Sequence, residues 1–437
     1  MTEILEDTMN VAQSEPASAP IHTSFKERIK GSAHEGEIAR AKSRLVTFVP
    51  GWPVLSPADF FRAGTSTILP FPLNAASQSY FYVARSAIYH LFRALRIKAD
   101  ECVLVPDYHS GNEVAAIRAT GTPMVYYSID RNLQPDLDQL SLLARRGARA
   151  LYVIHFIGWP QPMSQIVEFC RSRGLILVED CALSLLSRSG GQPLGSFGDY
   201  SVFCLYKTLP VPNGGLLVQN NPALPQIGPL QLRRCTRLSV AARGADLILG
   251  WIRNRSNRFG EPLARLKKIV GRTLSDAGVV RVPVGDIGFN PAHVDLSMSP
   301  VCRSLLRRLD YESIFRRRRS NYRRMYERLV GKAHPLCGEL DADVCPLFFP
   351  ILVPDKPAAA KALLRHGIEA TELWNRGDPQ VPGESSADAE FLRRHVLELP
   401  IHQGVSDDQV EYMAEQVLRL GLHFGHARRP VVENGSF

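Results

Sequence analysis

A chain of 437 residues is long enough for two domains, or for one large domain with an appendage. Its 45% hydrophobic and 22% charged residues are ordinary for a globular enzyme, and no apolar stretch is long enough to span a bilayer. The net charge of +9 is concentrated in residues 231–283, which excludes the pattern of a uniformly basic nucleic-acid-binding protein.

The first 43 residues are rich in Ser, Ala, Pro and Glu, which predicts a disordered segment. Acids stand where a secretory signal would carry bases, and no apolar core follows them. The eight cysteines are scattered, with no C-x-x-C pair and no His spacing suited to zinc. We therefore expect reduced thiols, no metal site and a cytoplasmic protein.

Helices and strands alternate from residue 80 to residue 180. Helical apolar spacing is seen at 80–97, 112–120, 137–147 and 164–174, and buried strands are predicted at 101–108, 123–130, 148–158 and 175–180. Because these strands are apolar on both faces, they predict an α/β fold with a mostly parallel central sheet and flanking helices. His109, His155 and Asp180 follow three of the strands, at the edge where such sheets bind ligands.

Lys207 follows the next predicted strand, about 27 residues after Asp180. A lysine amine can condense with an aldehyde cofactor, and a carboxylate at a strand end can keep the cofactor's ring nitrogen protonated. Taken alone, a lysine near glycines is usually a solvated loop residue, and such an aspartate is often a turn or N-cap residue. The interpretation depends on the residues around this pair.

Those residues resemble the DegT/StrS family of sugar aminotransferases, which use pyridoxal phosphate and have the type I aminotransferase fold. Val178–Ala182 matches the motif V-E-D-x-A, residues 191–199 match G-x-x-x-G-S-F-G-D, and Gly214-Gly215 stands seven residues after Lys207. The resemblance covers roughly residues 50–220 and 285–425 and indicates a divergent member. It implies that Lys207 forms the Schiff base and that Asp180 pairs with the ring nitrogen, whereas Glu179 points to the opposite side of the strand.

The resemblance also implies a phosphate site at a helix N-terminus, where Ala84–Ile88 replaces the family's Gly-Thr-x-Ala-Leu. Arg85 and Ser86 are the candidates there, with a plain buried helix start as the alternative. Cys204 stands nearest to the serine that the family places before its lysine. Asn290 replaces an asparagine that reaches the phosphate of the partner subunit, which implies a homodimer with a shared active site. A turn asparagine before a proline is the alternative.

Three further positions surround the expected cofactor ring. The family stacks an aromatic side chain on the ring, and His109 or Ser110 falls nearest to that position. His155 occupies an H-x-x-G-x-x-x-x-M pattern, and either bonds near the cofactor or is a satisfied core histidine. Leu183 departs from the family, which usually has His or Gln there.

Residues 222–285 interrupt the family pattern with two predicted helices, 238–255 and 261–274. Twelve Lys and Arg oppose three Asp and Glu between residues 231 and 283. The insertion is either a solvated hairpin or a peripheral membrane contact, in which Leu247–Leu249, Trp251 and Ile252 would lie beside the bases Arg253 and Arg255.

The remainder resembles the small C-terminal domain of type I aminotransferases. A long basic helix is predicted at 302–329, a strand at 345–353, and helices at 356–367 and 406–421, the last with Ser406 as N-cap. We divide the chain into a disordered segment (1–43), a large cofactor-binding domain (44–221), the basic insertion (222–285), a small α/β domain (286–425) and a flexible tail (426–437).

Together, these features predict a transaminase that moves an amino group from an amino acid, with glutamate expected, to a keto-sugar carried on a nucleotide. Lys207 argues against the family's dehydratase branch, in which a histidine replaces the lysine. Two alternatives stay open. One is an aminotransferase with a non-nucleotide or lipid-linked acceptor, and the other is a non-catalytic relative that acts as a binding partner. The protein is expected in the cytoplasm, or at a membrane if the insertion binds lipid.

Overall fold

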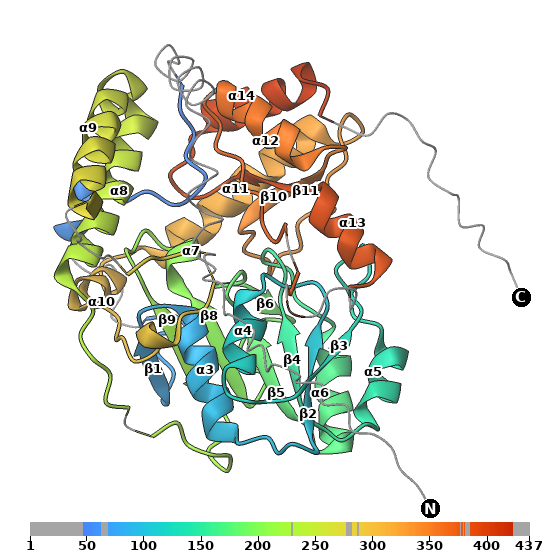
Figure 1. Ribbon diagram of the computed structural model, residues 1–437. Coiled ribbons are helices and arrows are strands. Elements are labelled where there is room, and N and C mark those ends of the chain that lie inside the picture. Colours follow the sequence, from blue (N-terminus) through green and yellow to red (C-terminus); the bar gives the residue numbers. More distant parts are fainter. Residues whose placement is uncertain are drawn as a thin grey trace, which may run out of the picture. The chain divides into compact units, whose positions relative to one another are not determined.

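The computed structural model describes residues 47–62, 69–228, 230–276, 282–285, 288–375, 377–378, 380 and 385–422 (Figure 1). The segments predicted as disordered or flexible, 1–43 and 426–437, lie outside these ranges. Within the described part of the chain, every helix is too short or too polar to cross a membrane.

A seven-stranded sheet forms the larger half of the described structure, in the order β1-β9-β8-β5-β4-β2-β3. The strands from β3 across to β8 are parallel to one another, whereas β9 is antiparallel to both β8 and β1. The predicted mostly parallel sheet is thus confirmed. The strands are β1 (Gln78–Phe81), β2 (Cys102–Pro106), β3 (Met124–Tyr127), β4 (Ala148–Ile154), β5 (Ile176–Asp180), β8 (Tyr200–Cys204) and β9 (Gly215–Gln219).

Helices flank this sheet, as Figure 1 shows. They are α3 (Ala84–Leu95), α4 (Asn112–Arg118), α5 (Leu137–Ala144) and α6 (Met163–Arg173). Strands β2, β5 and β8 are buried along their whole length, because helices and loops shield both of their faces. A short hairpin of β6 (Arg188–Ser189) and β7 (Gln192–Pro193) follows β5.

A second, two-stranded antiparallel sheet has a core of its own, with Phe349, Leu399 and Met413 fully buried. Its elements are β10 (Phe348–Leu352), β11 (Val396–Pro400), α11 (Tyr311–Leu329), α12 (Lys356–Arg365), α13 (Ala387–His395) and α14 (Asp407–Arg419). Ser406 caps α14 as predicted, by accepting a hydrogen bond from the Gln409 amide. The domain boundaries proposed from the sequence stay a prediction.

The single helix predicted over residues 302–329 is wrong. The chain forms α10 (Pro300–Leu306) and then, after a four-residue break, α11. The reason is a second N-cap: the Asp310 carboxylate accepts a hydrogen bond from the Ser313 amide and starts a new helix.

The insertion forms two packed helices, α8 (Arg237–Arg255) and α9 (Asn257–Asp276), shown side by side in Figure 1. Helix α9 begins four residues earlier than the sequence predicted. Two short 3-10 helices are also present, η1 (Pro57–Phe60) and η2 (Pro291–His293).

Candidate active site

Lys207 and Asp180 meet in one pocket at the carboxyl ends of the parallel strands. Asp180 is the last residue of β5, and Lys207 lies in α7 (Leu205–Thr208), a single helical turn directly after β8. The sequence placed this lysine on a loop. Both side chains are nearly buried, at 7% exposure for the lysine and 4% for the aspartate. The parallel pairing of β5 with β8 is what brings these two residues together.

The glycine pair after the lysine holds its turn against the start of α3. The Leu205 amide donates to the Gly214 carbonyl at 2.9 Å, and the Gly214 amide donates to the Tyr82 carbonyl at 2.9 Å. A Cβ on Gly215 would stand 2.4 Å from the backbone of Val83 and 2.5 Å from the Ala84 amide nitrogen. Only a glycine therefore lets β9 pass this close to the N-terminus of α3.

Asp180 is held in a fixed orientation by two donors. The Tyr152 hydroxyl donates to Oδ2 at 2.5 Å, and the Ala182 amide donates to Oδ1 at 2.8 Å. Burial raises the pKa of the Asp180 carboxyl, while the Tyr152 hydrogen bond and the Lys207 charge act in the opposite direction. Each oxygen keeps a lone pair for one more donor. The sequence did not predict Tyr152, which lies on the neighbouring strand β4.

Glu113 places a second buried carboxyl group in the pocket, and the sequence analysis missed it. It accepts hydrogen bonds from the Ser110 amide at 2.8 Å and from the Ser110 hydroxyl. Burial raises the pKa of Glu113, and the nearby Asp180 charge raises it further. An acid in the first turn of a predicted helix was the only signal, and acids are common at that position.

The N-terminus of α3 opens beside this pocket without a side-chain cap, since its N-cap residue is Val83. Arg85 lines the Lys207 pocket and also a neighbouring pocket, which Ser86 and Asn290 line with it. Its guanidinium donates to the Gly285 carbonyl at 2.7 Å. An uncapped helix start with an adjacent arginine is suited to an anion such as a phosphate.

Asn290 is the N-cap of η2, and its side chain accepts a hydrogen bond from the Ala292 amide at 2.9 Å. Asn290 therefore acts as a turn residue before Pro291, which was the alternative interpretation of its sequence. The residue is exposed and lines the same small pocket as Arg85 and Ser86, the phosphate-binding candidates of its own chain.

The two histidines proposed as cofactor contacts point elsewhere. His109 stacks on Tyr126 with ring centroids 5.6 Å apart, and its Nδ1 accepts from the Gly111 amide at 3.0 Å. Its neighbour Ser110 lines the pocket instead. Burial lowers the pKa of His109 to about 3, so this ring is neutral.

His155 is a buried histidine whose ring nitrogens both have partners within the protein core. Its Nε2 lies 3.0 Å from Glu179 Oε2, and its Nδ1 accepts from the Gln161 amide at 3.1 Å. Glu179 also accepts from the Gly195, Phe197 and Gly198 amides, which makes it a structural residue as predicted. His155, Glu179 and Cys181 are close enough together to ligate a metal, but these contacts already occupy the histidine and the carboxylate.

Three other residues in the walls of the Lys207 pocket bear on the sequence analysis. Cys204 lines it, at the end of β8, and Leu183 lines it where the family has a polar residue. Trp374 lines it from a segment that is remote in sequence, and packs edge-on against Tyr108 at 4.8 Å. The sequence analysis did not identify Trp374.

Residues 83–238 match the DegT/DnrJ/EryC1/StrS aminotransferase family, a range that contains Asp180, Lys207 and the glycine pair. Over these residues the chain matches the family, which confirms the predicted resemblance. The transaminase class and the pyridoxal phosphate cofactor are those that members of this family share.

Relatives of known activity share only part of the sequence. The chain is 33% identical over 141 residues to a GDP-perosamine synthase of Escherichia coli O157:H7, which covers 32% of this chain and 39% of that protein. It is 25% identical over 363 residues to a dTDP-4-dehydro-2,3,6-trideoxy-D-glucose 4-aminotransferase of Saccharopolyspora spinosa, covering 79% and 85%. The longer match covers most of both chains, with low identity.

Solved structures match over nearly their full length. The aminotransferase PseC of Helicobacter pylori has a TM-score of 0.59 at 16% identity, covering 85% of this chain and 98% of that one. The putative sugar aminotransferase Spr1654 of Streptococcus pneumoniae has a TM-score of 0.58 at 17% identity, covering 89% and 97%. These likenesses confirm the predicted fold.

Proposed function

We propose that this protein is a pyridoxal-phosphate-dependent aminotransferase that moves an amino group from an amino acid to a keto-sugar carried on a nucleotide. The observation that supports this most directly is the buried Lys207 beside the buried Asp180, in a pocket that adjoins the uncapped start of α3. Glutamate is the amino donor in this proposal. The acceptor class is inferred from the relatives, which act on GDP-linked and dTDP-linked sugars.

The residues of the pocket fit this cofactor. The cofactor supplies an aldehyde that bonds to amines and a ring that withdraws electrons once its nitrogen is protonated. Lys207 would hold the aldehyde carbon, and Asp180 would accept the ring N–H through a carboxylate that Tyr152 and Ala182 already orient. The α3 amides and Arg85 would take the phosphate.

These residues also define how protons move. As a free amine in this buried site, Lys207 would be able to take up and deliver a proton next to the substrate. Asp180 would favour the protonated form of the ring nitrogen. Trp374 and Leu183 line the same pocket with apolar surface, which limits water near the reacting groups.

Reaction of the purified protein with pyridoxal phosphate and borohydride tests this assignment. We expect a near-visible absorbance band that borohydride removes, with the added mass on the peptide that contains Lys207. Lys207→Ala should abolish the trapping, while substitution of the exposed Lys332 should leave it unchanged. Absence of a reducible adduct in the wild-type protein would favour a non-catalytic relative.

A second variant separates cofactor binding from catalysis. Asp180→Asn should still trap the cofactor at Lys207, but should transfer amino groups several orders of magnitude more slowly, since the ring proton is lost. Near-normal turnover would show that Asp180 does not face the ring nitrogen.

We further propose a cytoplasmic homodimer, in which Asn290 reaches the phosphate held by the partner subunit. The resemblance to the family supports this arrangement, and the position of Asn290 at the rim of the Arg85 pocket is compatible with it. An acceptor that is not a nucleotide sugar stays the alternative, since Leu183 lines the pocket where the family usually has His or Gln. Turnover assays with nucleotide-linked and free keto-sugars distinguish the two.

A further inference from the structure

Helix α9 carries a continuous row of exposed apolar side chains. Phe259, Leu263, Leu266, Ile269 and Val270 are 69%, 47%, 58%, 61% and 49% exposed. Half of the large hydrophobic residues that are exposed within the described part of the chain lie on this one helix. Their spacing places them on one face of the helix, across an arc of about 120°.

The opposite face of α9 is fixed against the rest of the protein. Glu261 pairs with Arg253 of α8 at 3.0 Å, and Lys267 pairs with Asp246 of α8. A Cβ on Gly260 would stand 2.4–2.7 Å from Arg253, so the two helices are in close contact there. The apolar row therefore cannot rotate inward without breaking these contacts.

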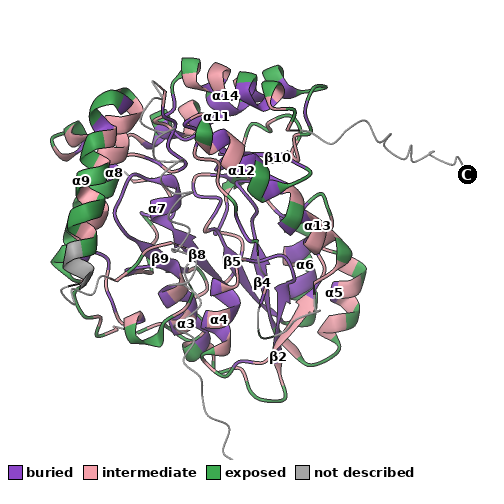
Figure 2. Ribbon diagram, turned by 45° about the horizontal axis from the view of Figure 1, so that its top comes forward, coloured by how far each residue is buried: buried purple, intermediate pink, exposed green. Residues whose placement is uncertain are grey.

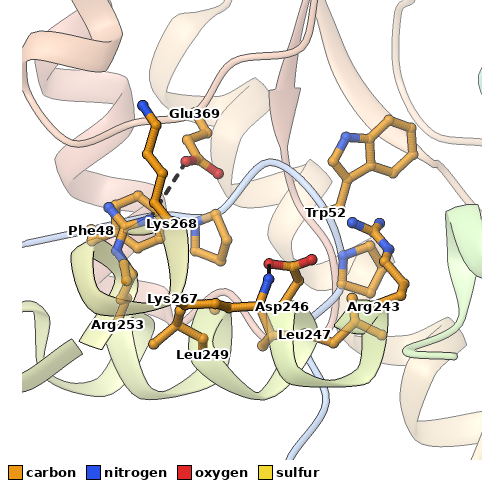
Figure 3. A pocket seen from close by; sticks show the side chains of 15 residues that line it. Phe48, Trp52, Arg243, Asp246, Leu247, Leu249, Arg253, Lys267, Lys268 and Glu369 are labelled. Carbon is orange, nitrogen blue, oxygen red and sulfur yellow. Dashed lines mark hydrogen bonds and ion pairs between the residues drawn. The ribbon is translucent and has the colours of Figure 1, made fainter. Parts of the chain in front are cut away.

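A cavity of about 350 Å³ lies where the hairpin meets residues 48–54 (Figure 3). Lys267 and Lys268 line it from α9, and Arg253 places its guanidinium over the Phe48 ring at 3.5 Å. The apolar row lines no part of this cavity. In Figure 2, α9 accordingly runs along the surface with exposed residues on its outer side.

The structure corrects the sequence-based choice of apolar residues. Leu247 of α8 is buried, and Leu249, Trp251 and Ile252 are partly buried. These α8 side chains are therefore less exposed than those of the α9 row. The exposed face belongs to α9.

The charges beside the apolar row indicate what it contacts. Arg258, Arg265 and Arg272 follow one another at seven-residue intervals and are all exposed along one flank of the row. Arg265 pairs with Glu261 at 3.3 Å. Helices α8 and α9 together contain nine Lys and Arg against three Asp and Glu. A second copy of the chain would bring the same excess of positive charge to this face, whereas an anionic surface complements it.

The apolar area of the row also favours a lipid surface over a second protein. Five side chains of this kind offer roughly 300–600 Å² of apolar area. A stable protein interface buries about 800 Å² on each partner. An amphipathic helix that lies in a membrane interface needs only one apolar face flanked by bases.

We propose that α9 docks the protein onto an anionic lipid surface, with its apolar row inserted at the level of the headgroups and its arginine flank on the lipid phosphates. The proposal is independent of the activity assigned to the Lys207 pocket. It places the enzyme beside substrates or products that are themselves held at a membrane.

Co-sedimentation of the full chain with vesicles tests the proposal. We expect binding to phosphatidylcholine vesicles that contain phosphatidylserine, little binding to phosphatidylcholine alone, and weaker binding as ionic strength rises. Leu266→Ser with Ile269→Ser should reduce the affinity at least tenfold. Arg258→Glu with Arg272→Glu should reduce it at least fivefold for each arginine changed.

Leu142→Ser on α5 is the matched control, because this leucine is 64% exposed but lies outside the basic insertion. It should bind vesicles as the wild-type chain does, and all variants should keep the wild-type melting temperature. Equal binding of the α9 variants and the wild type would overturn the proposal. So would an absence of wild-type binding, or an α9 double variant whose only change is a lower oligomeric mass in sedimentation, which would assign the face to a second copy.

Discussion

Glu113 and Asp180 place two buried carboxyl groups in one pocket, and burial raises the pKa of both. Two neighbouring carboxylates disfavour each other's ionised form. The folded protein therefore holds these protons more tightly than the unfolded chain does. The contribution of such a group to the free energy of unfolding is complete below the pKa that it has in the unfolded chain. This contribution is lost as the pH rises through the pKa that it has in the folded protein.

We predict that Glu113→Gln stabilises the protein free of cofactor at pH 7–8, because glutamine resembles the protonated acid and can still accept from the Ser110 amide. The gain in the free energy of unfolding should be on the order of 1 kcal/mol. It should vanish near pH 4, where glutamate is protonated in the unfolded chain as well. Urea unfolding at a series of pH values measures this difference.

Glu168→Gln is the control for this comparison, since Glu168 is exposed and paired only with Arg171 among the described residues. It should shift stability little at any pH. If Glu113→Gln lowers stability at pH 8 as much as at pH 4, the carboxylate is ionised and well compensated in the native state.

Individual site residues were predictable only where a local motif defines them. Asp180 and Lys207 stand in motifs that fold locally into a strand end and the turn after a strand. The sequence could not show whether His109 or Ser110 reaches the pocket, because neighbouring residues in a loop can direct their side chains to opposite sides. Glu113 and Trp374 reach the pocket through tertiary packing, and their local sequences carry no sign of it.

At the scale of elements, Gly215 decides how closely β9 and α3 approach each other. We predict that Gly215→Ala lowers the free energy of unfolding by about 3 kcal/mol, since its Cβ would clash with backbone that cannot move aside. It should also weaken cofactor binding by displacing the start of α3. Thermal melts with and without pyridoxal phosphate measure both effects.

Gly228→Ala is the matched control, as its Cβ would meet no atom within 4 Å. It should change neither the melting temperature nor its response to cofactor. An equally small effect at Gly215 would mean that the strand and helix can separate without consequence for the site.

Elements with a strong apolar period were predicted within a few residues, as β5 and α6 show. The break between α10 and α11 was missed because the basic residues on both sides continue the helical pattern through it. The Asp310 cap was its only signal, and a lone aspartate among arginines reads equally well as an ion-pairing residue. The orientation of α8 and α9 is set by tertiary contacts such as the Arg253–Glu261 pair, so the sequence could not show which apolar face is exposed.

At the scale of the whole molecule, Asn290 contributes to the phosphate site either of its own chain or of the partner subunit. Within one chain it shares a pocket with Arg85 and Ser86, at the side of the α3 N-terminus. In the proposed homodimer it instead completes the phosphate site of the partner subunit. Closed two-fold symmetry would then give two equivalent sites, each built from both chains.

We predict that mixing two inactive variants, Lys207→Ala and Asn290→Ala, restores activity if the sites are shared. A mixed dimer then contains one site with both residues intact and one with neither. Random exchange of subunits makes half of the dimers mixed, so about a quarter of the wild-type activity should return. Sedimentation should show a particle of twice the 48.6 kDa chain mass. Exchange should be verified with a tagged subunit. Complete exchange without any recovered activity would show that Asn290 acts on the pocket of its own chain, where Arg85 already lies beside it.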